Sequence, residues 1–248
     1  MTTDLQSPPS PSAGVLGLNL SQSTFNRVQF GTVTVLIALT VFHYVYADAH
    51  GKDMIAYLSG TFDAGRENSI PTWFSILNLL LSGLLVLTIF GHARRLGDPA
   101  ARYWLGLGIL MLGLSMDEGA SLHERLQRSQ EVTGVLVPVI ESHPWLLYGA
   151  VFATLAFLVF VPFLRRIGPR LAALFLLSGG LFLAGALGFE FMAAWMIHNQ
   201  ISAPGELPYL IRRAFEEGCE MYGIALFNCV LFGEIRARNI GLTLTSKA

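Results

Sequence analysis

The sequence predicts an all-α fold, a single bundle of six transmembrane helices, and three observations support this. Of the 248 residues, 53% are hydrophobic and 13% are charged, whereas soluble domains carry about 25% charged residues. The mean hydropathy is +0.54. Several apolar runs also reach about 20 residues, the length that a helix needs to cross the hydrocarbon core. An ordinary soluble globular protein is therefore excluded.

Six apolar runs bounded by charged or turn residues are the expected spans. They cover residues 28–47, 71–90, a third run that starts at residue 103, 145–164, 171–197 and 207–233. The third is purely apolar only to Met116, because Asp117 and Glu118 follow. Residues 1–25 are too polar to fold and are expected to form a disordered leader. Residues 26–235 are the expected six-span domain, and 236–248 a short tail.

The distribution of Lys and Arg predicts that both termini are cytoplasmic. Cytoplasmic connections carry an excess of positive residues, and the six spans place ten Lys and Arg on the side of the termini and six on the other. Two short connections with three arginines each fall on the same side. They contain Arg94, Arg95 and Arg102, and Arg165, Arg166 and Arg170.

The charge balance excludes a nucleic-acid partner and leaves membrane lipids as the expected surroundings. The chain has 16 Lys and Arg against 17 Asp and Glu, so it has no basic surface for phosphates. Gly180, Ala184 and Gly188 repeat at helical spacing, a pattern typical of helices that approach closely in lipid. Such glycine-rich faces could also join a second copy or a larger membrane complex.

Ionisable residues within the spans gather at one depth. A charge at mid-bilayer costs about 2.5 to 3.5 kcal/mol, so each needs a partner, a cavity or a function. At about 1.5 Å per residue, Asp117, Glu190 and Glu220 all fall in the outer part of the membrane. The first span adds His43, Asp48 and His50 near its outer end. We therefore expect a polar site near the extracytoplasmic side.

Helical spacing directs several of these residues toward common faces. The third span has one stripe at steps of three and four, made of Gly106, Leu110, Gly113, Asp117, Ser121 and Glu124. His123 lies at its margin, where Gly119 could bend the turn to bring the imidazole in. On the sixth span one arc of about 100° contains Arg213, Glu216, Glu217 and Glu220.

Carboxylates and histidine from several helices predict a divalent metal site, with iron, manganese or zinc as the candidates. The expected metal ligands are His123, Glu190, Glu216 and Glu220. The expected catalytic residues are Asp117, Glu118, Glu124 and Glu217. The spacing departs from that of di-iron bundles, because His123 follows Glu118 by five positions and the sixth span offers no histidine.

The alternative for the same residues is an ion-paired plug. Arg212 with Glu216, and Arg213 with Glu217, are i, i+4 partners, and Arg125 and Arg128 follow Glu124. Seven acids against four arginines still leave three negative charges. They are Asp117, Glu118, Glu124, Glu190, Glu216, Glu217 and Glu220 against Arg125, Arg128, Arg212 and Arg213. This excess must be met by cations, protonation or water.

Two motifs resemble an uncharacterised family of bacterial multi-pass membrane proteins. One is Asp117-Glu118 followed by His123-Glu124, a D-E-x-x-x-x-H-E signature, and the other is an E-E-x-x-E-M signature at residues 216–221. The likeness covers about the last two thirds of the chain. It implies that the acidic and histidine positions belong together, and it is consistent with a bacterial inner membrane. No activity carries over.

The leading functional prediction is a metal-dependent membrane enzyme that acts on a lipid or another apolar substrate. A metal-activated water beside a carboxylate would give hydrolysis, and a redox metal would give oxidation. The alternatives are a transporter coupled to protons or metal cations and a non-catalytic subunit of a membrane complex. Against a transporter are the small size, the lack of an inverted repeat and the lack of acids in the inner half.

Overall fold

The protein is all-helical in the computed structural model, which describes residues 20–51, 53–126 and 137–240, with no strand among them. The long helices are α1 (Gln22–His50), α3 (Ile70–Arg95), α4 (Ala101–Ala120), α7 (Trp145–Leu164), α8 (Pro169–Leu183) and α10 (Leu207–Ala237). The shorter elements are α2 (Met54–Ser59), η1 (Gly60–Phe62), α5 (Leu122–Arg125), η3 (Pro138–Ile140), the π-helix η4 (Ala184–Phe189) and α9 (Glu190–His198).

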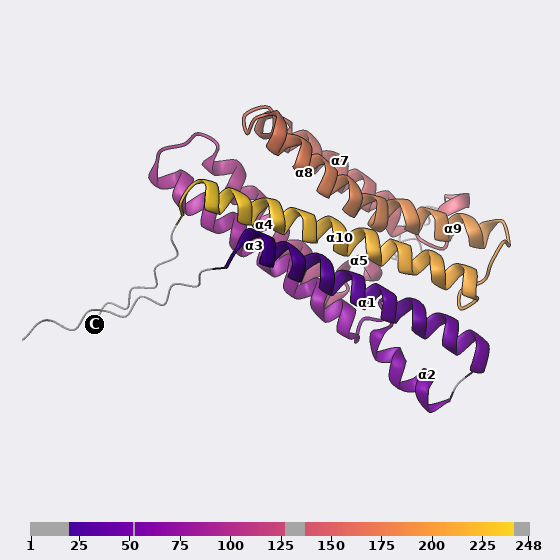
Figure 1. Ribbon diagram of the computed structural model, residues 1–248. Helices are drawn as coiled ribbons and strands as arrows, with labels where there is room; N and C mark the ends of the chain where they lie inside the picture. Colours follow the sequence, from indigo (N-terminus) through magenta and orange to yellow (C-terminus); the bar gives the residue numbers. More distant parts are fainter. Residues whose placement is uncertain (1–19, 52, 127–136, 241–248) are drawn as a thin grey trace, which may run out of the picture.

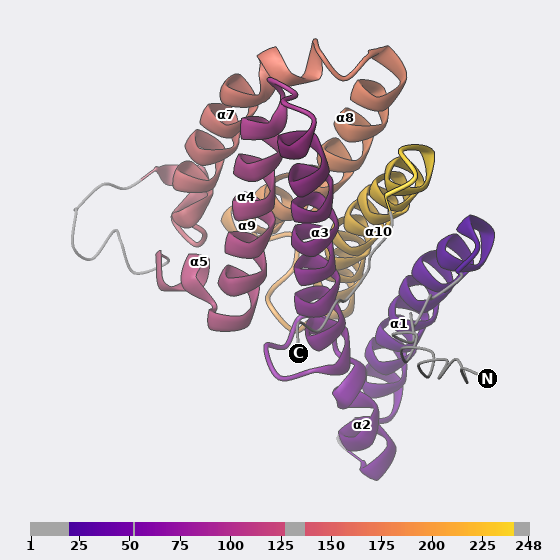
Figure 2. The same cartoon turned by 90° about the vertical axis from the view of Figure 1, so that its left-hand side faces the viewer.

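Five helical segments are long and apolar enough to cross a membrane, so the expected count of six is not confirmed. They are Gln22–His50, Ile70–Arg95, Trp145–Leu164, Pro169–His198 and Leu207–Ala237. The expected third span, α4, is not among them, because Arg102 near its start and Asp117 and Glu118 near its end lower its hydropathy. It nevertheless packs along α3 (Figure 2).

The first helix begins earlier than the sequence predicts. It starts at Gln22, where the Ser21 hydroxyl accepts a hydrogen bond from the backbone N–H of Thr24 at 3.1 Å. Serine at this position satisfies one of the free N–H groups of the first turn. Residues 22–25 are therefore helical, although they fall in the expected disordered leader, and residues 1–19 lie outside the described part.

Helix α10 is the centre of the bundle and packs against α1, α3 and α8 (Figure 1). In its most apolar 18-residue window 56% of residues are buried, compared with 11% in α7 and in α8 to α9. The last two segments therefore direct most of their apolar surface outward, as helices that face lipid do.

Both ends of the described chain meet, because Arg236 Nη1 donates to the Leu20 carbonyl at 2.7 Å. We call this the near end, and the opposite end with α2 the far end.

A packed apolar core fills the near half of the bundle. Trp104, Phe163, Phe175, Phe227 and Leu231 from α4, α7, α8 and α10 are buried there. The Trp104 and Phe163 rings pack edge to face with centroids 4.9 Å apart. This core lies between the near end and the charged residues of α10, so it determines on which half of the bundle a polar site can form.

Close helix packing occurs at different glycines from those of the expected ladder. A Cβ added at Gly180 or Gly188 would meet no atom within 4 Å, whereas one at Gly185 would lie 2.6 Å from the Glu216 carbonyl oxygen. One at Gly223 would lie 2.7 Å from the Phe182 backbone nitrogen. The α8 residues that meet Gly223 are Ser178 and Phe182, so α10 packs on a face of α8 that does not include Gly180.

Candidate functional site

The candidate site lies in the far half of α10, where two arginines and three glutamates occupy neighbouring turns. Arg212 Nη1 donates to Glu216 Oε2 at 2.5 Å and to the Phe189 carbonyl at 2.7 Å. Both side chains are buried, with residue exposures of 4% and 6%. The expected pairing of Arg212 with Glu216 is confirmed, and it connects α10 to the residue that precedes α9.

The second expected pair on this helix does not form in the described part of the chain. None of the ion pairs there joins Arg213 to Glu217. The Arg213 guanidinium instead lies 5.6 Å from the centre of the Tyr209 ring. It interacts electrostatically with Tyr44, Asp63 and Glu216. The ion-paired plug is therefore incomplete.

Glu190 enters the site from the start of α9. The π-helix η4 precedes it, and single π-turns inside helices occur frequently at functional sites. Its carboxyl group contacts that of Glu216, and Oε2 lies 3.1 Å from His143 Nε2. Glu190 and Glu216 are thus brought together as the sequence predicts.

His143 is a site residue that sequence reasoning missed. It lies in the connection before α7, and the Ser142 hydroxyl is 2.8 Å from its Nδ1. Burial, and then the positive charges of Arg212 and Arg213, lower the pKa of His143 to about 4. The imidazole is therefore neutral at neutral pH. A histidine before a proline gave no sequence signal for a contact with a distant helix.

Glu217 and Glu220 extend the group of acidic side chains along α10. Glu217 interacts with Glu216, Glu118 and Glu190, and with Arg213 as a cation. Glu220 interacts with Glu217, Glu118, Glu216 and Glu190. We define the glutamate cluster as Glu118, Glu190, Glu216, Glu217 and Glu220. Three helices, α4, α9 and α10, supply it.

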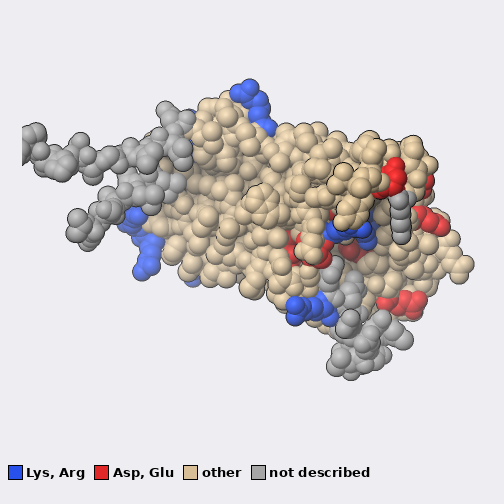
Figure 3. All heavy atoms as spheres, turned by 90° about the horizontal axis from the view of Figure 1, so that it is seen from below, with Lys and Arg blue, Asp and Glu red and all other residues tan. Residues whose placement is uncertain are grey.

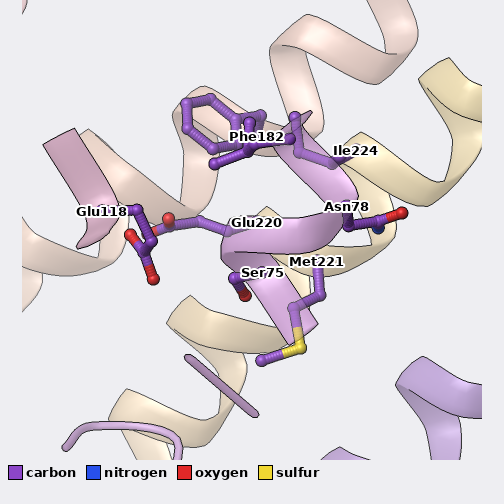
Figure 4. A pocket seen from close by; sticks show the side chains of 8 residues that line it. Ser75, Asn78, Glu118, Phe182, Glu220, Met221 and Ile224 are labelled. Atoms are coloured by element: carbon purple, nitrogen blue, oxygen red, sulfur yellow. The ribbon is translucent and has the colours of Figure 1, made fainter. Parts of the chain in front are cut away.

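A small cavity separates α4 from α10 beside this cluster (Figure 4). Glu118 and Glu220 point toward one another across it, and Ser75 of α3 lies on the Glu220 side. Its volume is about 10 Å³, which is about the space of one water molecule. The remaining lining residues are Asn78, Leu79, Phe182, Met221 and Ile224.

A buried polar network continues from this cavity toward the middle of the bundle. Asn78 lines the cavity and its Oδ1 accepts a hydrogen bond from Asn228 Nδ2 at 2.7 Å. Ser82 Oγ donates to Asn228 Oδ1 at 2.7 Å. All three residues are buried. The network stops at the apolar core, whose Leu85, Val86 and Ile89 follow on the same helix.

Asp117 and His123 pair with each other at the end of α4. Asp117 accepts a hydrogen bond from the His123 backbone N–H at 2.9 Å, and its Oδ2 lies 2.9 Å from His123 Nδ1. Ser121 has a left-handed conformation with φ 49°, so the helix ends there. The predicted stripe therefore does not continue through Ser121 to Glu124, whose side chain lies outside the described part.

The remaining predicted residues lie apart from the cluster or outside the description. His43 Nδ1 is 2.8 Å from the Ser59 hydroxyl, and Asp48 and His50 are exposed. Arg128 lies outside the described residues. On the face shown in Figure 3, the visible acidic side chains occupy the half of the molecule that carries the far end.

The donor set suits a divalent cation, but its side chains do not yet converge on one point. In the ranges that the structure describes, no three His, Cys, Asp or Glu side chains form a group that could hold a metal ion. Carboxylate oxygens nevertheless are ligands that iron and manganese accept, and zinc accepts them together with imidazole. Metal binding would require a further carboxylate of the cluster to turn toward Glu118 and Glu220.

A family model described as a domain of unknown function (DUF8692) matches residues 30–234. The chain belongs to this family. Membership in the DUF8692 family is consistent with the resemblance to an uncharacterised family, while the two signatures and the bacterial origin stay predictions. No curated protein and no solved structure matches the chain. The DUF8692 match extends from α1 through most of α10, so it includes every residue of the glutamate cluster.

Proposed function

We propose that the chain is an integral membrane enzyme that binds a divalent cation at the glutamate cluster and acts on a lipid or another apolar substrate. The observation that carries this proposal is the gathering of carboxylates around Glu220, which interacts with Glu217, Glu118, Glu216 and Glu190. Adjacent carboxylates in a medium of low dielectric constant repel one another strongly. A divalent cation offsets two such charges and uses the same oxygens as ligands.

The cluster also suits catalysis beside a bound cation. The cation would supply Lewis-acid chemistry or, if it is redox-active, oxidation chemistry. A glutamate that is not a ligand would accept or donate a proton at the reacting group. Glu217 and Glu118 are the candidates for this proton transfer, because the charge of each acts on Glu220. A Lewis-acidic cation would lead to hydrolysis, and a redox-active one to oxidation.

The apolar core favours an enzyme over a transporter. A transport path requires polar groups or water across the whole bilayer, whereas the polar network from Asn78 ends at the buried side chains of Val86 and Ile89. The glutamate cluster, with Glu118 and Glu220, lies on the far side of this core. We therefore expect no flux of protons or divalent cations when the purified protein is placed in vesicles.

Metal analysis of detergent-purified protein tests the proposal. We expect close to one or two divalent ions per chain in the wild type, and a clear loss in Glu220→Gln, because an amide is a poorer and neutral ligand. Glu234→Gln is the matched control. Glu234 lies on the same helix but accepts a hydrogen bond from Arg238 Nε at 2.7 Å. Metal-free wild-type protein that is unaffected by a chelator would contradict the proposal.

A further inference from the structure

The connection between η1 and α3 contacts the charged part of α10 at Gly65. A Cβ added at Gly65 would lie 2.1 Å from Arg213 Cδ and 2.8 Å from its Nη1. The Arg213 side chain therefore lies directly on the backbone of this residue. Gly65 is not among the residues with positive φ. Lack of space, and not backbone conformation, makes glycine necessary here.

Hydrogen bonds to α1 fix the position of this connection. Asp63 is 8% exposed, and its carboxylate accepts hydrogen bonds from the Tyr44 hydroxyl at 2.5 Å and from the Gly65 N–H at 3.1 Å. Arg66 Nε lies 3.3 Å from the same carboxylate. The Thr40 hydroxyl donates to the Phe62 carbonyl at 2.6 Å. The backbone that presses on Arg213 is therefore held in place by hydrogen bonds to α1.

Arg213 acts on the connection and on the glutamate cluster at the same time. Its charge interacts with Asp63 and Glu216. The same charge acts on Glu217 and Glu190. Because the energy between charges depends on their separation, the position of one guanidinium determines how much of the cluster's negative charge is offset.

We propose that Gly65 and Asp63 are positioning residues, which hold Arg213 as the counter-charge of the glutamate cluster and thereby set the affinity of the cluster for a divalent cation. The proposal rests on the proposed function for the nature of the ligand. It assigns a role in the site to a connection whose residues supply no ligand. If the connection only supported the fold, loosening it would weaken cation binding. Under the present proposal, loosening it strengthens cation binding.

Mn²⁺ binding to the full chain in detergent tests the proposal. Arg213→Ala removes a positive charge beside the cluster, so we expect Mn²⁺ affinity to rise at least about tenfold. Gly65→Ala displaces the guanidinium from its present position and should change the Mn²⁺ affinity by a smaller factor. Tyr44→Phe loosens Asp63 without adding volume and should raise the Mn²⁺ affinity, as Arg213→Ala does. Gly60→Ala is the control, because its Cβ would have no neighbour closer than 3.5 Å.

The double variant Gly65→Ala/Arg213→Ala isolates the contact. We expect it to bind Mn²⁺ like Arg213→Ala alone, since interacting positions are not additive. An unchanged affinity in Gly65→Ala, or an equal shift with and without Arg213, would overturn the proposal. Wild-type protein that binds no Mn²⁺ would instead contradict the proposed function. The melting temperatures of the wild type, Gly65→Ala, Arg213→Ala and the double variant would then decide the positioning role. Gly65→Ala should lower the melting temperature only where Arg213 is present.

Discussion

The imidazole of His143, in the connection before α7, lies 3.1 Å from the carboxylate of Glu190 at the start of α9. His143 is 8% exposed, and burial and the charges of Arg212 and Arg213 lower its pKa to about 4. The contact therefore joins a neutral ring to a partly buried acid. It also holds the connection against the glutamate cluster.

This pairing predicts a pH-dependent stability. Because the unfolded chain binds a proton on this histidine below about pH 6.5 and the folded chain only near pH 4, acidification between these values favours unfolding. The loss should approach about 3 kcal/mol once both states are protonated. His143→Gln should remove it, so the melting temperature of the variant should fall less than that of the wild type between pH 7 and 4. Parallel curves would contradict the assignment.

Asp117→Asn should be tolerated. Asp117 pairs with His123, and none of the described ion pairs joins it to Arg212 or Arg213. The change therefore weakens the hydrogen bond to the His123 ring and leaves the buried Arg212 guanidinium paired with Glu216. We expect the free energy of unfolding to fall by about 1 kcal/mol. Melting of the purified variant measures this cost. A loss of about 3 to 5 kcal/mol, as expected when a buried ion pair is broken, would show that Asp117 has another partner.

Two glycine substitutions should separate close packing from open space. Gly223→Ala places a Cβ 2.7 Å from the Phe182 backbone nitrogen and 2.8 Å from the Ser178 carbonyl oxygen, and such overpacking costs about 1 to 3 kcal/mol. Gly180→Ala meets no atom within 4 Å and should be neutral, or stabilising by up to about 1 kcal/mol. The yield and the melting temperature of folded protein in detergent compare the two. Equal effects would contradict the packing of α10 against α8.

The convergence of the glutamates was predictable from the sequence. Glu190 and Glu220 were expected at one depth from the rise per residue, and the pairing of Arg212 with Glu216 follows from their spacing of four. These inferences depend only on the regular geometry of helices. They hold wherever a helix is continuous.

Features that depend on helix irregularities or on tertiary contacts were not predictable. The ladder of Gly180 and Gly188 lies where no neighbouring atom comes within 4 Å of an added Cβ, and the left-handed Ser121 ends the stripe of α4. The contact of His143 with Glu190 joins segments whose separation in the sequence carries no periodic signal. The position of Arg213 on Gly65 similarly depends on how the connection after η1 folds back.

The predicted orientation can be tested at α2. Tyr57 is 79% exposed and lies at the far end, which the distribution of arginines predicts to be extracytoplasmic. In a background without Cys219 and Cys229, Tyr57→Cys should react with a membrane-impermeant maleimide added to intact cells, and a reporter fused after Lys247 should be cytoplasmic. Reaction only after the membrane is broken would place the glutamate cluster on the cytoplasmic side.

Anomalous diffraction from crystals soaked in Mn²⁺ tests cation binding at the glutamate cluster most directly. We expect a peak within about 2.0 to 2.6 Å of carboxylate oxygens between α4 and α10, with Glu220 and Glu118 as ligands. The peak should be absent in Glu220→Gln crystals soaked in the same way. No peak in the wild type, or a peak only at exposed acids away from these helices, would contradict the proposed function.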